Sequence, residues 1–120
     1  MGKRIITNVI GGERVESSSG ETTDLVNPST GEVFAAAALS SEQDVDRAYT
    51  VAQEAFGTWR DSTPSERQAA LLAIADTLES HAEELVALES ENTGKPIAVT
   101  MAEEIPPMID QIRFFAGAAR

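Results

Sequence analysis

The sequence predicts an α+β fold in which a β-hairpin region is followed by three to four α-helices. Three observations support this prediction. The first 38 residues contain short apolar pairs that alternate with turn-forming residues. From Ser40 onward, apolar residues recur at helical spacing behind helix-start signals. No strand pattern alternates with the helices, so the segment is predicted to be an incomplete piece of an α/β fold.

The composition limits the classes of function. The chain has 120 residues, a formal net charge of -11 and no cysteine. An acidic chain without clustered Lys and Arg is a poor partner for nucleic acid. The lack of cysteine excludes disulfides, thiolate metal sites and a cysteine nucleophile within this chain. No apolar run reaches the ~20 residues of a membrane span, and no secretory leader is recognised, so a cytoplasmic location is expected.

Short strands are expected over about residues 4–38. Weak apolar pairs surround Gly11-Gly12, and the polar residues 16–23 predict a loop or wide hairpin. Residues 27–32 (NPSTGE) predict a turn, because Asn-Pro opens turns and Gly31 can adopt a positive φ. Residues 33–38 should return as a strand, although their alanines favour helix in isolation.

Helices are expected over about residues 41–120. Residues 41–44 and 63–66 resemble capping boxes, and Pro64 suits the first position of a helix. Residues 80–83 resemble a third box, which predicts a break near Ser80. Gly94 is expected to end a helix, with Pro96 two residues later.

The last helix should begin near Glu103 or Glu104, because Pro106 and Pro107 are tolerated only in a first turn. Gly117 is followed by two alanines, which favour helix, so no stop signal is seen before Arg120. A helix without a stop signal predicts a chain cut from something larger.

Residue chemistry alone reveals no catalytic centre. His81 is the only histidine, and one histidine builds no zinc site unaided. Gly11-Gly12 lacks the context of a phosphate-binding loop. The acidic pairs are typical of solvated helix faces. No catalytic residue and no cofactor-binding residue is therefore assigned.

Four motifs in register resemble the aldehyde dehydrogenase superfamily. They are NPSTGE at residues 27–32, a helix that ends in Trp59, PSER at residues 64–67, and LESENTGKP at residues 88–96. The last segment, EIPPMIDQIRFFAGAAR at residues 104–120, resembles that of bacterial γ-aminobutyraldehyde (1-pyrroline) dehydrogenases. The resemblance covers nearly the whole chain.

The resemblance implies the N-terminal part of an enzyme about four times longer, with residues 1–120 belonging to its cofactor-binding domain. Such a parent belongs to an NAD(P)-dependent family and is expected to use NAD. It is expected to be a homotetramer that oxidises an aldehyde, which is 4-aminobutanal by this likeness. The family's catalytic cysteine, general base and cofactor contacts lie downstream, so the chain alone is expected to be inactive and to bind no cofactor. Its partners would be the remainder of the parent enzyme or its subunits. The alternatives are a non-catalytic interaction module that docks onto dehydrogenase subunits, and a helical adaptor whose likeness is coincidental.

The resemblance also implies two sets of site residues. In aminoaldehyde dehydrogenases, two acidic residues at the start of the last helix face the substrate tunnel; Glu104 matches one of these places, and Pro107 occupies the other. Asp110 is also assigned to the tunnel, but it lies six residues after Glu104, about 600° around the helix, so the two are not expected to reach one ligand. The alternative for Glu104 is a helix cap. Betaine-aldehyde relatives bind a monovalent cation at positions that match Leu25, Val26 and Asn92, where Asn92 replaces an acidic residue and leaves a weaker ligand.

Overall fold

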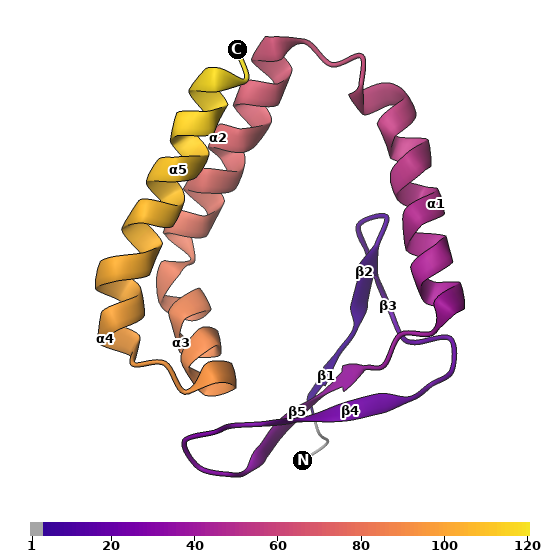
Figure 1. Ribbon diagram of the computed structural model, residues 1–120, viewed down its shortest axis with the longest axis vertical. Coiled ribbons are helices and arrows are strands. Elements are labelled where there is room, and N and C mark those ends of the chain that lie inside the picture. Colours follow the sequence, from indigo (N-terminus) through magenta and orange to yellow (C-terminus); the bar gives the residue numbers. More distant parts are fainter. Residues whose placement is uncertain (1–3) are drawn as a thin grey trace. The chain divides into compact units, whose positions relative to one another are not determined.

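The computed structural model describes residues 4–120 as a mixed α+β structure, as predicted (Figure 1). The chain divides into two compact units, Met1–Asp61 and Ser62–Arg120. The boundary follows the first helix, so the first unit contains all the described strands and the second is helical. Within residues 4–120, no helix is both long and apolar enough to cross a membrane.

Three strands of the first unit form a sheet in the order β1-β5-β4. Strand β1 (Arg4–Ile6) runs parallel to β5 (Val33–Ala38), and β4 (Thr22–Val26) runs antiparallel to it. The predicted turn at residues 27–32 joins β4 to β5. The Asn27 side chain accepts the Ser29 amide at 2.9 Å, and Gly31 has φ 75°. The alanine-rich segment is a strand because it pairs with a neighbour on each side.

Strands β2 (Asn8–Ile10) and β3 (Glu13–Val15) form a separate hairpin. Gly11 and Gly12 connect them with φ values of 63° and 82°. Two successive positive φ angles are typical of a type I′ turn, which matches the twist of the paired strands. These glycines therefore serve the hairpin, as the absence of a phosphate-loop context predicts.

Helix α1 (Glu42–Trp59) begins with the predicted capping box. The Ser41 amide donates to the Asp44 carboxylate at 2.8 Å, and the Asp44 amide donates to Ser41 Oγ at 3.3 Å. The same carboxylate accepts the Ser18 amide at 3.1 Å and the Ser17 hydroxyl at 3.2 Å. Hydrogen bonds from Ser41 and Ser18, above all from the Ser41 amide, lower the pKa of Asp44 to about 2. Asp44 is 6% exposed, and it fastens the loop before β4 to the helix start.

The second unit is built on three helices, α2 (Pro64–Ser80), α3 (Ala82–Thr93) and α5 (Ile105–Ala118). Figure 1 shows α5 running beside α2. Small side chains let the two helices approach closely, and the buried apolar residues of the unit are Ala75, Val86, Ile109 and Ala116. On the surface of this pair, Arg113 of α5 bonds Asp76 at 2.9 Å and Glu79 at 2.5 Å.

The start of α2 follows the prediction, whereas the start of α3 does not. Thr63 and Glu66 form a complete capping box, with Pro64 at the first position. The chain breaks at residue 81 as expected, but the predicted capping box at residues 80–83 is wrong. Ser80 Oγ donates backward to the Thr77 carbonyl at 2.9 Å, and the N-cap His81 makes no capping bond with its side chain. The hydroxyl is therefore occupied by the last turn of α2.

A helical segment that the sequence did not predict precedes α5. It consists of α4 (Ile97–Val99) and the π-helical turn η1 (Thr100–Glu104). The Ile105 amide donates to the Thr100 carbonyl, five residues back. Pro106 and Pro107 have no amide hydrogen to continue an α-helical ladder into this turn. The prolines do occupy the first turn of α5, as predicted, and the helix continues through Gly117 to Ala118.

Candidate functional site

The candidate site lies in the second unit, where the chain turns from α3 toward α5. Gly94 ends α3 with φ 76°, and its amide donates to the Ser90 carbonyl at 2.9 Å. This left-handed cap confirms the predicted helix end. The Lys95 amide then donates to Thr93 Oγ1 at 3.3 Å, and Thr100 Oγ1 donates to the Pro96 carbonyl at 3.3 Å. These bonds hold the turn that carries the Lys95 side chain.

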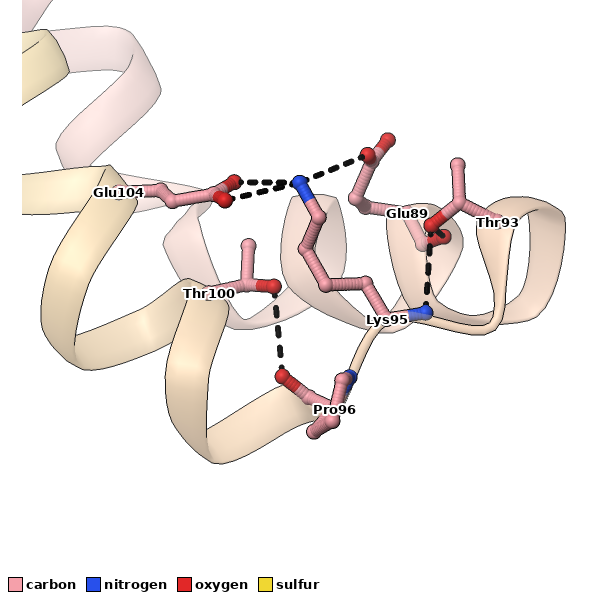
Figure 2. A network of polar contacts seen from close by, with 6 residues as sticks. All are labelled: Glu89, Thr93, Lys95, Pro96, Thr100 and Glu104. Atoms are coloured by element: carbon pink, nitrogen blue, oxygen red, sulfur yellow. Dashed lines mark hydrogen bonds and ion pairs between the residues drawn. The ribbon is translucent and has the colours of Figure 1, made fainter.

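Glu104 forms an ion pair with Lys95 (Figure 2). Lys95 Nζ lies 2.8 Å from Glu104 Oε1 and 3.0 Å from Oε2, and it lies 3.8 Å from Glu89 Oε1. The hydrogen bond to Glu104, followed by the attraction of both carboxylates, raises the pKa of Lys95. One ammonium therefore serves two carboxylates, and the group of Glu89, Lys95 and Glu104, termed here the acidic triad, has a net negative charge.

The structure bears on one of the two roles considered for Glu104, that of a helix cap, while its assignment to the substrate tunnel stays a prediction. Glu104 occupies the position that precedes α5, yet its side chain makes no hydrogen bond to the first amides of that helix. It therefore does not cap α5 through a side-chain hydrogen bond. Its carboxylate is instead directed to Lys95, and its side chain is 46% exposed.

A cavity of about 400 Å³ adjoins the acidic triad. Glu89 and Glu104 are on its wall, together with the buried Thr100. The remaining wall is apolar and comes from α2, α3 and α5: Leu78, Leu85, Val86, Ile105 and Met108. The arrangement combines carboxylate oxygens with a hydrocarbon surface, which suits a short alkyl chain that carries a positive charge.

Asp110, the second predicted tunnel residue, lies on α5 and is exposed. Among the described residues it has no ion pair or side-chain hydrogen bond, and it does not line the cavity. The structure therefore brings Glu89 and Lys95 to Glu104 and leaves Asp110 apart from this group. Its assignment to the tunnel stays a prediction.

The predicted cation ligands are distributed over the two units. Leu25 and Val26 lie on β4, where the pairing with β5 shifts register between them. Asn92 is exposed near the end of α3. Within residues 4–120, no group of three or more His, Asp or Glu side chains could hold a metal ion. A carbonyl-based cation site stays a prediction.

Sequence reasoning missed Lys95 and Glu89 as members of the site. One signal was available, because Lys95 is one of only two lysines in a chain of net charge -11. A lone ammonium between acidic segments is expected to find a carboxylate. The choice of Glu104, nine residues on, depends on the turn at Gly94 and on η1, which periodicity does not reveal.

Comparison with known proteins gives a consistent result. The model of the aldehyde dehydrogenase family matches residues 15–120. An aldehyde dehydrogenase of Vibrio cholerae is 41% identical over 118 residues, which are 98% of this chain and 23% of that protein. Among solved structures, the NAD+ complex of aldehyde dehydrogenase from Bacillus cereus has a TM-score of 0.90 at 35% identity, covering 95% of this chain and 24% of that one. A double mutant of betaine aldehyde dehydrogenase from Staphylococcus aureus, in complex with NAD+, has a TM-score of 0.88 at 33% identity, covering 93% and 23%. The chain thus spans about a quarter of the length of the relatives it matches.

Proposed function

The chain belongs to the aldehyde dehydrogenase family, and from this we propose that it is the N-terminal segment of an NAD-dependent enzyme that oxidises an aldehyde to a carboxylic acid. The observation that carries the proposal is the family match over residues 15–120. The use of NAD is supported by the Bacillus cereus relative, whose structure was solved as an NAD+ complex.

The proposed reaction assigns this segment a supporting role. In this chemistry a thiolate attacks the aldehyde carbon, hydride passes to the nicotinamide, and water hydrolyses the resulting thioester. The chain has no cysteine, so it supplies no nucleophile. We assign it to the cofactor-binding domain, where its strands and helices support the residues that hold NAD.

The absence of a nucleophile gives a direct test. The purified 120-residue chain should form no NADH from NAD and an aldehyde, while a full-length protein that contains it should do so. The reason is that the first bond of the reaction needs the missing thiolate. Turnover by the chain alone that persists through repurification would refute the assignment.

For the substrate, we propose an aldehyde with a distal amine, 4-aminobutanal, recognised through Glu104. Two observations support this choice: the likeness of residues 104–120 to γ-aminobutyraldehyde dehydrogenases, and the apolar cavity beside two carboxylates. The ion pair of this carboxylate with the Lys95 ammonium also supports the proposal. The Staphylococcus aureus relative is named for betaine aldehyde, which also carries a cationic group.

Substitution of Glu104 by Gln in the full-length enzyme tests this proposal. A partly desolvated contact between carboxylate and ammonium contributes about 1–3 kcal/mol, so KM for 4-aminobutanal should rise about tenfold. Because the amine is remote from the reacting carbon, kcat should change little. KM for butanal should change with neither Glu104→Gln nor the control Glu103→Gln. An equal rise in KM for both aldehydes would reduce Glu104 to a structural residue.

A docking role remains the second candidate, and exposed aromatic side chains favour it. Phe56 of α1 is 57% exposed, and Phe114 and Phe115 of α5 are 70% and 60% exposed. We propose that these rings are covered by the rest of the parent enzyme or by its subunits, which we expect to form a homotetramer. Co-expression of the chain with the remaining three quarters of the enzyme tests this, because recovery of a single active complex supports docking and separate elution opposes it.

We also propose a monovalent-cation site at Leu25, Val26 and Asn92. The β4–β5 pairing shifts register between Leu25 and Val26, and such a local break in a ladder is common next to functional sites, which supports the proposal. Activity of the full-length enzyme should then depend on potassium or sodium. Asn92→Asp should lower the concentration required, because a carboxylate binds a hard cation more strongly than an amide does. Activity that is insensitive to both ions would exclude the site.

A further inference from the structure

The ammonium of Lys95 occupies the same carboxylate to which we assign the amine of the substrate. Lys95 Nζ reaches both oxygens of Glu104, at 2.8 and 3.0 Å. Figure 2 shows the side chain extending from the turn after α3 toward the π-helical turn, with Glu89 on its other side. A second ammonium that approaches Glu104 therefore meets a carboxylate that is already paired.

The Lys95–Glu104 pair is readily exchanged. The side chains of Lys95 and Glu104 are 37% and 46% exposed. Exposed ion pairs contribute little to stability, because water solvates both charges well. Replacing one ammonium by another at this position therefore costs the fold little. The second carboxylate, Glu89, remains beside Lys95 at 3.8 Å and can keep its charge paired when Glu104 turns to another cation.

We propose that Lys95 is a positioning residue that acts as an internal competitor for Glu104 and so sets the enzyme's affinity for amine-bearing aldehydes. The proposal rests on the function proposed above and names the group that limits it. Its two consequences are opposite in sign. Loss of Glu104 weakens binding of the amine, whereas loss of the Lys95 ammonium strengthens it.

The ion pair itself is tested in this chain by NMR of 13C-methylated lysines. Lys3 and Lys95 are the only lysines, so Lys95→Arg assigns the Lys95 signal. Glu104→Gln should lower the titration midpoint of Lys95, because the hydrogen bond and the attraction that raise its pKa are lost. The matched control is Glu103→Gln, because Glu103 is exposed and has no ion pair among the described residues. A midpoint that responds equally to both variants, or to neither, would overturn the proposal.

Kinetics of the full-length enzyme test the competition. Lys95→Met should lower KM for 4-aminobutanal about two- to fivefold, which corresponds to removal of one exposed ion pair. The ratio of KM for 4-aminobutanal to KM for butanal should fall by the same factor. Lys95→Arg keeps the positive charge, so its KM for 4-aminobutanal should equal that of the unaltered enzyme. A purely structural role for Lys95 would instead change KM for both aldehydes together.

The outcomes separate the two proposals. If the unaltered enzyme does not prefer 4-aminobutanal to butanal, the proposed substrate is wrong, and the role of Lys95 is lost with it. If the enzyme has the preference and Lys95→Met leaves KM for 4-aminobutanal unchanged or raises it, only the role of Lys95 is wrong.

Discussion

Val86 is the largest side chain that is fully buried within the described residues, and its truncation gives the most direct test of the second unit. Val86→Ala removes two methyl groups, which costs about 1.6 kcal/mol at ~0.8 kcal/mol per buried carbon. A void of roughly 50 Å³ adds up to about 1 kcal/mol if the surrounding helices do not close on it. Alanine is a better helix former than valine, which offsets about 0.5 kcal/mol of this loss of stability. The expected net loss is about 1–2 kcal/mol.

Urea unfolding of the chain followed by far-UV circular dichroism measures this loss. With a slope of about 1–3 kcal/mol per molar urea, the midpoint should fall by roughly 0.5–1.5 M. Val99→Ala is the matched control, because Val99 is also helical but 41% exposed. The control variant has the same gain in helix propensity and removes little buried apolar surface. Its urea midpoint should therefore equal that of the unaltered chain or rise slightly. Equal losses for the two variants would refute the assignment of Val86 to the core.

Three further predictions concern the ends and surfaces of helices. The pKa of Asp44 is lowered from 3.8 to about 2, so the stabilising effect of this carboxylate is complete above pH 3.8 and is lost as the pH falls from there toward 2. Asp44→Asn should lower the thermal midpoint at neutral pH and abolish the fall of the midpoint between pH 3.8 and 2. An acid profile that is unchanged by the substitution would contradict this. Gly94→Ala places a β-carbon at φ 76° and should lower the free energy of unfolding, measured in urea, by about 1–2 kcal/mol. Gly117→Ala lies within α5 with open space around it and should raise that free energy by about 0.5–1 kcal/mol. A change of the same sign for both variants would show that backbone conformation is not the cause. Phe114 and Phe115 are 70% and 60% exposed, so the chain should self-associate in sedimentation velocity, and their joint replacement by Ser should reduce the association; a monomer at every concentration would oppose this.

Local signals predicted the elements that depend on local chemistry. The capping boxes at Ser41 and Thr63, the turn around Asn27 and the cap at Gly94 all formed as expected. Each of them is determined by bonds between residues only a few positions apart. Such bonds can be read from spacing alone, which explains why the α+β class and most boundaries were correct.

The predictions failed where two hydrogen-bond partners compete for one side chain, or where contacting residues lie far apart in the sequence. At Ser80 the hydroxyl could cap the next helix or bond back to Thr77, and the sequence does not rank these choices. Ile109 is 3% exposed on α5, which packs beside α2, and helical periodicity alone does not identify that partner helix. The Lys95–Glu104 pair spans nine residues and depends on an unpredicted π-helical turn. The resemblance, rather than residue chemistry, led to Glu104.

The π-helical turn at residues 100–104 also affects how the chain should be aligned with its relatives. A π-helical turn holds one residue more than an α-helical turn of the same span, so it behaves as a single-residue insertion in a continuous helix. Removal of that residue rotates everything before it by about 100° relative to α5. For a relative whose helix is α-helical through this turn, an alignment that opens no gap here equates Glu104 with a neighbour on another face of the helix. Assignments of function across this turn should follow superposed backbones rather than matched letters.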